Sequence, residues 1–196
     1  MSTRIGRRIG LLGGSFNPAH KGHLHLSRTA LERLDLDEVW WLVSPQNPLK
    51  SIAGMAPFAE RVAKARIAAE DETRIVVSEI ERDMGTRYTI DTLRQLRVRF
   101  PQNRFVFLLG ADNFIQLPQW RSWGAIMRTV PIAIFPRPSY SYRALTGRAA
   151  KRFARFRVPD VRAYRLAERR APAWVFVGMA PDATSATRIR QRRALL

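Results

Sequence analysis

The stretch that decides the fold covers residues 7–35 and reads RRIGLLGGSFNPAHKGHLHLSRTALERLD. Its first part is a short apolar run that ends in a pair of glycines, which predicts a buried strand followed by a tight turn. Its last part carries Leu24, Leu31 and Leu34 at the spacing of one helix face. The stretch therefore predicts a strand, a turn and a helix, in that order.

The same alternation continues to the end of the chain. Further strands are predicted at 38–44, 73–80, 104–111, 130–136 and 173–179, and helices at 58–71, 89–100, 112–117, 122–128, 141–156 and from about Ser185. Parallel strands need crossovers of this length, and the crossover helices cover both faces of the sheet. We therefore predict an α/β fold with a doubly wound parallel sheet and a helical C-terminal portion. The arginine-rich segment 155–172 gives no clear prediction.

Composition limits the function classes. A chain of 196 residues fits a single domain over 1–196, and a hydrophobic content of 46% argues against disorder. The longest apolar runs are too short to span a membrane, and we expect no signal peptide in the first residues. The absence of cysteine excludes disulfides, thiolate catalysis and thiolate-bound metals. We expect a cytoplasmic protein with no membrane partner and leave its oligomeric state open.

The charge is strongly basic and unevenly distributed. The net charge is +18, and residues 137–196 contribute +12 of it through 15 basic and three acidic side chains. Such a field attracts nucleotides, nucleic acid or an anionic surface. Of the 34 basic residues, 30 are arginines. The alternative to a polyanion-binding site is a solvated, arginine-rich surface with no ligand. The role of segment 143–170 stays open.

All three histidines of the chain follow the first predicted strand. His20 and His23 are three positions apart where the helix begins, so both rings can project from one face. Two imidazoles beside a helix N-terminus suit an anion whose charge grows in a transition state. A histidine metal site is the less favoured alternative, since no third His or Cys lies elsewhere. His25 points to another face, and we expect it to be structural or exposed.

Residues 13–23, GGSFNPAHKGH, follow neither common phosphate-binding pattern, G-x-G-x-x-G or G-x-x-x-x-G-K-[ST]. They resemble the signature of the nucleotidyltransferase superfamily with a (His/Thr)-x-Gly-His motif, which is related in fold to class I aminoacyl-tRNA synthetases. The chain is most similar to the bacterial nicotinate-nucleotide adenylyltransferase family over nearly its full length. The segments that carry this similarity are SPQNPLK (44–50), RYTIDTLRQLR (87–97), FLLGADNFIQLPQW (107–120) and TSATRIR (184–190).

The resemblance implies adenylyl transfer from ATP to the 5′-phosphate of nicotinate mononucleotide, a late step of NAD biosynthesis. The products would be nicotinate adenine dinucleotide and pyrophosphate, with no covalent enzyme intermediate. Magnesium is the implied cofactor, because ATP carries it and its phosphates supply most ligands. Catalysis would rest on positioning and charge stabilisation.

The resemblance also assigns residues. The implied catalytic residues are His20, His23 and Arg190. The implied ATP-binding residues are Gly13, Gly14, Ser15, Phe16, His20, His23, Gly110, Asp112, Ser185, Thr187 and Arg190. The implied nicotinate mononucleotide-binding residues are Asn17, Lys50, Thr89, Trp120 and Arg121. Of these, Trp120 would stack on the pyridine ring, and the main-chain amides at Thr89 and Arg121 would meet the nicotinate carboxylate.

Three positions differ from the family pattern. This chain has Asn17 where the family has an aspartate, Leu49 where it has a histidine and Thr184 where it has an isoleucine. We expect Asn17 to brace the turn by hydrogen bonding. Each of four assignments has a structural alternative. Asp112 could be an N-cap, Trp120 a core residue, Lys50 a solvated loop residue and 184–190 an ordinary capped helix. Trp123 is expected to serve packing.

The sequence leaves two alternative functions open. A sibling transferase would act on nicotinamide mononucleotide or phosphopantetheine, or would use CTP, but such enzymes do not share the segments RYTIDTL and LPQW together. A basic nucleic-acid-binding protein would need exposed aromatic side chains among its basic ones, and Phe153, Phe156 and Tyr164 are the only candidates in the basic segment.

Overall fold

Seven parallel strands form one sheet in the computed structural model, which describes residues 6–46 and 54–178. The strands are β1 (Arg8–Gly14), β2 (Glu38–Val43), β3 (Ile75–Ser78), β4 (Arg104–Gly110), β5 (Ile132–Phe135), β6 (Arg157–Val158) and β7 (Trp174–Phe176). Their order is β3-β2-β1-β4-β5-β7-β6, and every neighbouring pair is parallel. This order starts in the middle of the sheet and winds outward in both directions, which confirms the predicted doubly wound sheet.

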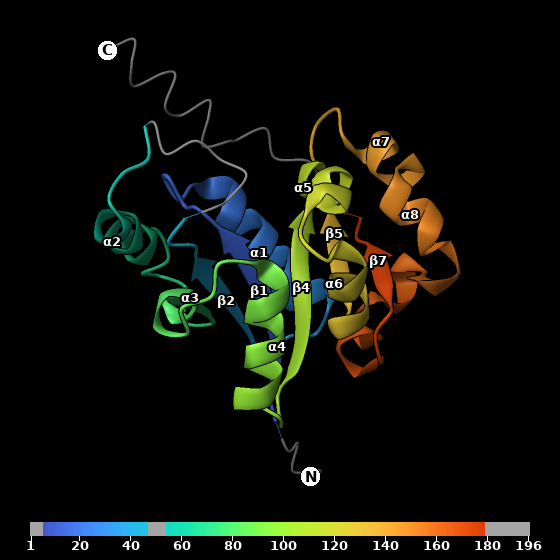
Figure 1. The fold of residues 1–196 in the computed structure, drawn as a ribbon, viewed down its shortest axis with the longest axis horizontal. Helices are drawn as coiled ribbons and strands as arrows, with labels where there is room; N and C mark the ends of the chain where they lie inside the picture. The colour runs from blue at the N-terminus through green and yellow to red at the C-terminus, as the bar shows by residue number, and fades with distance from the viewer. Residues whose placement is uncertain (1–5, 47–53, 179–196) are drawn as a thin grey trace.

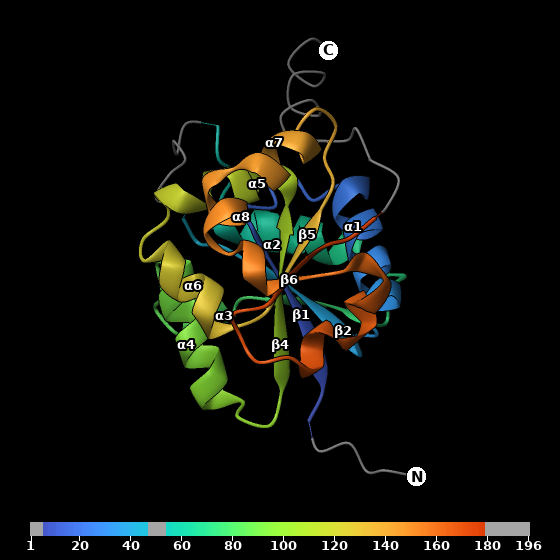
Figure 2. The ribbon, with the colours of Figure 1, turned by 90° about the vertical axis from the view of Figure 1, so that its right-hand side faces the viewer.

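Helices cover both faces of the sheet. The α-helices are α1 (Lys21–Arg33), α2 (Phe58–Ala68), α3 (Ile80–Asp83), α4 (Thr89–Arg99), α5 (Ala111–Gln116), α6 (Trp123–Thr129), α7 (Ser141–Thr146) and α8 (Arg148–Arg152). The described residues also form three 3-10 helices, η1 (Leu117–Gln119), η2 (Ala154–Phe156) and η3 (Asp160–Glu168). Helices α4 and α6 lie in front of the sheet in Figure 1 and α1 lies behind it, as the turned view in Figure 2 confirms.

The side chains of each central strand alternate between two cores. In β4, Phe105, Phe107 and Leu109 pack against α4, α5 and α6, whereas Val106 and Leu108 pack on the side of α1, α2 and η3. All five are at most 3% exposed. Strands buried on both faces read as continuous apolar runs, which is why the sequence predicts them well.

The predicted helix at 141–156 is wrong as a single element. Gly147 has an extended backbone (φ −71°, ψ 168°) and separates α7 from α8, and η2 follows as a 3-10 turn. Glycine disfavours the helix interior, so the helical pattern breaks where it stands. The segment that gave no prediction, 155–172, contains β6 and η3. The helix predicted from about Ser185 lies outside the described residues.

The topology fixes where a ligand binds. β1 and β4 are neighbours with Leu12 opposite Leu108, so the turn after Gly14 lies beside the end of β4 at Gly110. The chain winds away in opposite directions from this pair of strands, and ligands of such sheets bind at the carboxyl ends there. No helix within 6–46 and 54–178 is long and apolar enough to cross a membrane.

Candidate active site

The turn between β1 and α1 holds the histidine pair. His20 is the N-cap of α1, and its Nδ1 accepts a hydrogen bond from the main-chain N–H of Gly22 at 3.1 Å. The Nδ1 of His23 accepts from the main-chain N–H of His20 at 3.2 Å, which completes a reciprocal capping box. Since Nδ1 is an acceptor in both rings, a neutral ring carries its proton on Nε2. The helix start therefore fixes two N–H donors side by side, with ring centroids 3.9 Å apart.

Aromatic packing holds these rings from beneath. The Phe16 ring lies 4.8 Å from that of His23 and 5.0 Å from that of Trp41. Trp41 is fully buried and donates from Nε1 to the Ser27 hydroxyl at 2.8 Å. Phe16 is 2% exposed and has a positive φ of 47°, an unfavourable backbone conformation for an aromatic residue. Its side chain thus packs between His23 and the buried Trp41.

Two polar side chains of the same turn differ in their bonding. The hydroxyl of Ser15 is buried and has no hydrogen-bond partner among the described residues. The side chain of Asn17 donates to the carbonyl of Gly54 at 2.9 Å and accepts from the N–H of Ala56 at 3.3 Å. The bracing role expected for Asn17 is confirmed, since it ties the turn to the segment before α2.

The end of β4 presents a carboxylate that lacks a donor. Oδ1 of Asp112 is buried without a hydrogen-bond partner among the described residues, and the Nε of Arg137 lies 4.0 Å away. A Cβ at Gly110 would stand 2.4 Å from this oxygen, so a larger residue there would require the Asp112 side chain to move. The N-cap of α5 is Gly110, with no side-chain cap bond, so the alternative of an Asp112 cap is wrong. A buried acceptor without a donor is suited to a ligand hydroxyl.

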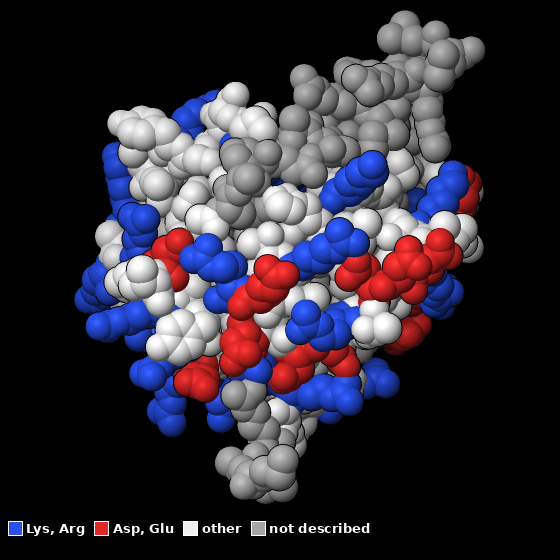
Figure 3. Space-filling model, turned by 180° about the vertical axis from the view of Figure 1, so that it is seen from behind, with Lys and Arg blue, Asp and Glu red and all other residues white. Residues whose placement is uncertain are grey.

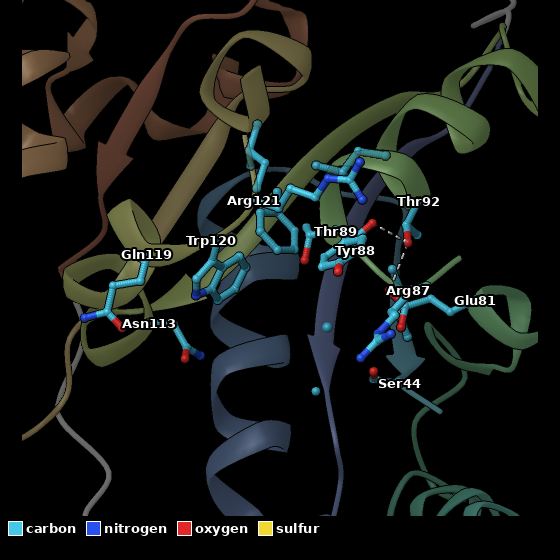
Figure 4. Close-up of a pocket in the computed structure, with 16 residues that line it drawn as sticks. Ser44, Glu81, Arg87, Tyr88, Thr89, Thr92, Asn113, Gln119, Trp120 and Arg121 are labelled. Atoms are coloured by element: carbon cyan, nitrogen blue, oxygen red, sulfur yellow. Dashed lines mark hydrogen bonds between the residues drawn. The ribbon is translucent and has the colours of Figure 1, made fainter. Parts of the chain in front are cut away.

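A cavity of about 470 Å³ opens beside the glycine pair, between β1, β2 and the segments around α4 and η1. Figure 4 shows Trp120 on one side, Glu81, Arg87 and Ser44 on the other, and Thr89, Tyr88 and Arg121 between them. The complete lining is Gly13, Gly14, Leu42, Ser44, Glu81, Arg87, Tyr88, Thr89, Thr92, Leu93, Phe107, Asn113, Gln119, Trp120, Arg121 and Ile126. Five residues assigned from the sequence therefore line one cavity, namely Gly13, Gly14, Thr89, Trp120 and Arg121.

The two tryptophans that follow α5 differ as expected. Trp120 is partly buried, lines the cavity and touches Phe107 only edge-on, at 6.4 Å between ring centroids. The ring of Trp123 packs edge-on against Phe153 at 5.8 Å, and the guanidinium of Arg152 lies over it. The packing role of Trp123 is confirmed. Trp120 lines the cavity and is also partly buried against the core, so its contact with a ligand stays a prediction.

Glu81 is a cavity residue that the sequence analysis missed. Burial raises the pKa of its carboxyl to about 7, and hydrogen bonds from Thr92 and Ser44 partly oppose this shift. The Thr92 hydroxyl lies 3.2 Å from the Glu81 carboxylate and 2.8 Å from the hydroxyl of Thr86. Its position just after β3, at the carboxyl edge of the sheet, is the signal that could have identified it.

Several assigned residues lie outside the described ones. Lys50, Ser185, Thr187 and Arg190 belong to this group, as do the departures Leu49 and Thr184. Their convergence on the histidine pair stays a prediction. Within 6–46 and 54–178, no three His, Asp or Glu side chains gather in a way that could hold a metal ion.

The surface charge is mixed on the face that α1 covers. Figure 3 shows acidic and basic side chains interspersed there. Arg28 pairs with Glu72, Arg33 with Asp160 and Lys64 with Glu60. This face therefore offers no uninterrupted basic surface to a polyanion.

Comparisons with known proteins agree with this geometry. A family model described as cytidylyltransferase-like matches residues 11–192. A protein of Parvibaculum lavamentivorans named "Probable nicotinate-nucleotide adenylyltransferase" is 54% identical over 187 residues, which are 95% of this chain and 92% of that protein. A protein of Methylorubrum extorquens with the same name is 51% identical over 185 residues, 94% of this chain and 100% of its own length.

Solved structures share the fold. The nicotinic acid mononucleotide adenylyltransferase of Plasmodium falciparum, complexed with NaAD, has a TM-score of 0.72 at 16% identity, with 94% of this chain and 83% of that chain covered. The same enzyme complexed with APC has a TM-score of 0.69 at 15% identity and the same coverage. With its histidine turn and its close relatives, the chain belongs to the cytidylyltransferase-like family of nucleotidyltransferases, and within that family to the nicotinate-nucleotide adenylyltransferases.

Proposed function

We propose that the protein transfers the adenylyl group of ATP to the 5′-phosphate of nicotinate mononucleotide, forming nicotinate adenine dinucleotide and pyrophosphate. The observation that carries this proposal is the pair of imidazoles locked by the capping box at the carboxyl end of β1, beside a cavity with a tryptophan in its wall. The relatives that are about 50% identical over more than 90% of the chain bear the name of this activity.

The reaction needs positioning and charge stabilisation more than covalent chemistry. A phosphate oxygen of nicotinate mononucleotide attacks the α-phosphorus of ATP and forms the new P–O bond. The bond from the α-phosphorus to the bridging oxygen breaks, and its electron pair leaves with pyrophosphate. His20 and His23 donate from Nε2 to the non-bridging α-phosphate oxygens as their charge grows. Such fixed donors need no reorganisation during the step.

The ATP side of the site is formed by the ends of β1 and β4. The ATP contacts of Gly13 and Gly14 are proposed from the sequence, and the buried Oδ1 of Asp112 accepts from a ribose hydroxyl. The Ser15 hydroxyl, which is also buried without a partner in the described residues, is a further contact. The phosphate contacts of Lys50, Ser185, Thr187 and Arg190 are proposed from the sequence alone.

Magnesium enters as part of the substrate. The phosphates of ATP would supply most of the ligands of the ion, as they do for magnesium bound with nucleotides. It would neutralise charge on the leaving pyrophosphate, and no residue of the described chain is assigned to it.

The cavity is proposed to hold the pyridine nucleotide. Trp120 stacks on the pyridine ring, while the main-chain amides at Thr89 and Arg121 donate to the nicotinate carboxylate. A carboxylate accepts from both amides, whereas the NH₂ group of a carboxamide cannot, and this difference favours the acid. The guanidinium of Arg121 lies 4.5 Å from the centre of the Tyr88 ring, which orders this wall of the cavity. A single domain over residues 1–196 and a cytoplasmic location stay predictions.

A panel of acceptors tests the proposal. Purified protein with ATP and magnesium receives nicotinate mononucleotide, nicotinamide mononucleotide or phosphopantetheine, and released pyrophosphate is measured; CTP replaces ATP in a parallel series. We expect the fastest release of pyrophosphate with ATP and nicotinate mononucleotide. Faster release with another acceptor, or with CTP, would assign the chain to a sibling activity.

A further inference from the structure

A buried arginine, Arg61, is assigned no contact with a substrate, and main-chain carbonyls of the site surround its guanidinium. Arg61, in the first turn of α2, is 2% exposed. Its guanidinium donates to four main-chain carbonyls, those of Ser15 at 2.6 Å, Ser44 at 2.8 Å, Pro45 at 2.9 Å and Ala56 at 3.0 Å. None of the ion pairs among the described residues includes it.

Burying the charged guanidinium of Arg61 costs free energy that an apolar side chain at the same position would not cost. Removing a guanidinium from water is unfavourable, and burial accordingly lowers the pKa of Arg61. A methionine or leucine would pack into the same face of α2 beside Val62 and Ala65 without that cost. What only arginine provides is a planar fork of five N–H donors that can bind several carbonyls at once.

The four carbonyls come from the segments that surround the reaction site. Ser15 precedes Phe16, on whose ring His23 packs. Ser44 lines the cavity and hydrogen-bonds to Glu81, and its main-chain N–H donates to the carbonyl of Gly14 at 2.9 Å. One guanidinium therefore connects the wall beneath the histidines to the wall of the cavity.

A second residue, Asn17, also hydrogen-bonds to the segment before α2. Asn17 bonds to Gly54 and Ala56, and Arg61 bonds to the carbonyl of Ala56. The histidine turn is thus anchored by two side chains to the same short segment. Loops at strand ends need such ties, because their own main chain lacks the ladder bonds of a strand.

We propose that Arg61 is a positioning residue for adenylyl transfer, which holds the main chain at Ser15 and Ser44 so that the histidine pair and the cavity keep a fixed distance from each other. It touches neither substrate and acts through Phe16 and His23. The inference rests on the proposed function for its kinetic consequence, although the anchoring itself does not depend on the reaction.

Arg61→Ala and its matched control Val62→Ala test the proposal. Val62 is also 2% exposed on α2, so its truncation removes buried contacts but none of the four bonds. We expect Arg61→Ala to lower kcat by about 10- to 100-fold, since a misplacement of about 1 Å costs this much. The KM for nicotinate mononucleotide should change little, because Trp120 and Thr89 keep their places. Val62→Ala should lower the Tm and leave kcat unchanged.

Chemical rescue separates positioning from general destabilisation. Millimolar guanidinium, far below denaturing levels, should restore part of the kcat of Arg61→Ala, whereas sodium chloride at equal ionic strength should not. Arg61→Lys replaces the alanine variant if that variant does not fold, and its ammonium should recover only part of the rate. A kcat like that of Val62→Ala, or a lowered kcat that guanidinium leaves unchanged, would overturn the proposal.

A second measurement, NMR of the histidine rings, does not depend on enzymatic activity. The chain has three histidines, so its imidazole nitrogens give a simple NMR spectrum. Arg61→Ala should shift the ring signals of His20 and His23 and leave those of His25 in place. If wild-type protein transfers no adenylyl group but these shifts occur, the proposed function fails while the anchoring role stands. Unchanged His20 and His23 signals would overturn the anchoring role.

Discussion

His20 and His23 cap the start of α1 for each other, and their ring centroids lie 3.9 Å apart. Each Nδ1 is used by a main-chain N–H, at 3.1 Å for His20 and 3.2 Å for His23. The residues that begin the helix are thus also the ones that present Nε2 to a phosphate. One arrangement serves both stability and chemistry, and suitable variants can separate the two.

Asparagine at position 20 keeps the cap and removes the donor. Its side-chain oxygen can accept the N–H of Gly22, as asparagine does at many N-caps, but it cannot place a donor where Nε2 stands. His20→Asn should therefore fold with a Tm near that of the wild type and lose about 10²- to 10³-fold in kcat. His20→Ala should lose the same activity and also about 1 kcal/mol of stability. Full activity in His20→Asn would contradict the catalytic role.

Trp120→Ala should raise the KM for nicotinate mononucleotide far more than the KM for ATP. The ring forms one wall of the cavity, is partly buried against the core on this side of the sheet and contacts Phe107 edge-on. Loss of a base-stacking aromatic costs about 1–3 kcal/mol of binding, or about 5- to 150-fold. Trp123→Ala is the control and should lower stability without changing either KM. Equal effects on both substrates would refute stacking.

Glu81→Gln should change how stability depends on pH. Folding raises the pKa of Glu81 from about 4.5 to about 7, so the folded state binds the extra proton between these values. The stability of the wild type therefore falls as the pH rises through this window, by about 3 kcal/mol at most, and stays lower above it. The neutral glutamine escapes this penalty.

Urea titrations of wild type and Glu81→Gln at pH 5 and pH 8 measure this difference. The variant should gain stability relative to the wild type at pH 8 and little at pH 5, where both side chains are largely neutral. A difference in stability that is the same at both pH values would place the Glu81 titration outside this window.

Asp112→Asn should weaken ATP binding without harming the fold. The buried Oδ1 has no donor in the described residues, so the carboxylate contributes little to stability, whereas a hydrogen bond to a ribose hydroxyl would be charge-assisted. We expect the KM for ATP to rise about 10-fold or more and the Tm to stay equal or increase. Asp83→Asn, an exposed carboxylate of α3, is the control and should change neither value. An unchanged KM for ATP in Asp112→Asn would remove this residue from the site.

The predictable parts of this molecule are those that local pattern controls. Strands such as β4 are buried on both faces, so they appear as apolar runs, and α1 shows its apolar face through leucines. The histidine pair and Trp120 stand in short recognisable segments. The helix break at Gly147 and the 3-10 helix η3 escaped prediction, because arginine-rich sequence without a clear period carries little information about local structure.

The residues that were missed are charged ones whose burial is set by distant segments. Arg61 looks like part of a solvated helix face, and only the loops ending at Ser15 and Ala56 enclose it. Glu81 stands among other charges in the sequence, and only the fold places it under Thr92 in the cavity wall. The capping by His20 was also missed, since histidine is not among the usual N-cap residues.

The most direct test of the account follows the α-phosphorus of ATP. ATP labelled at the α-phosphate is mixed with nicotinate mononucleotide and magnesium, and the products are separated for the wild type and for His20→Asn. With wild-type protein we expect the α-phosphate label in the dinucleotide, and label placed at the γ-phosphate instead should appear in pyrophosphate. His20→Asn should form the dinucleotide at least about 100-fold more slowly. Label that stays in ATP, or a dinucleotide formed equally fast by His20→Asn, would contradict the account.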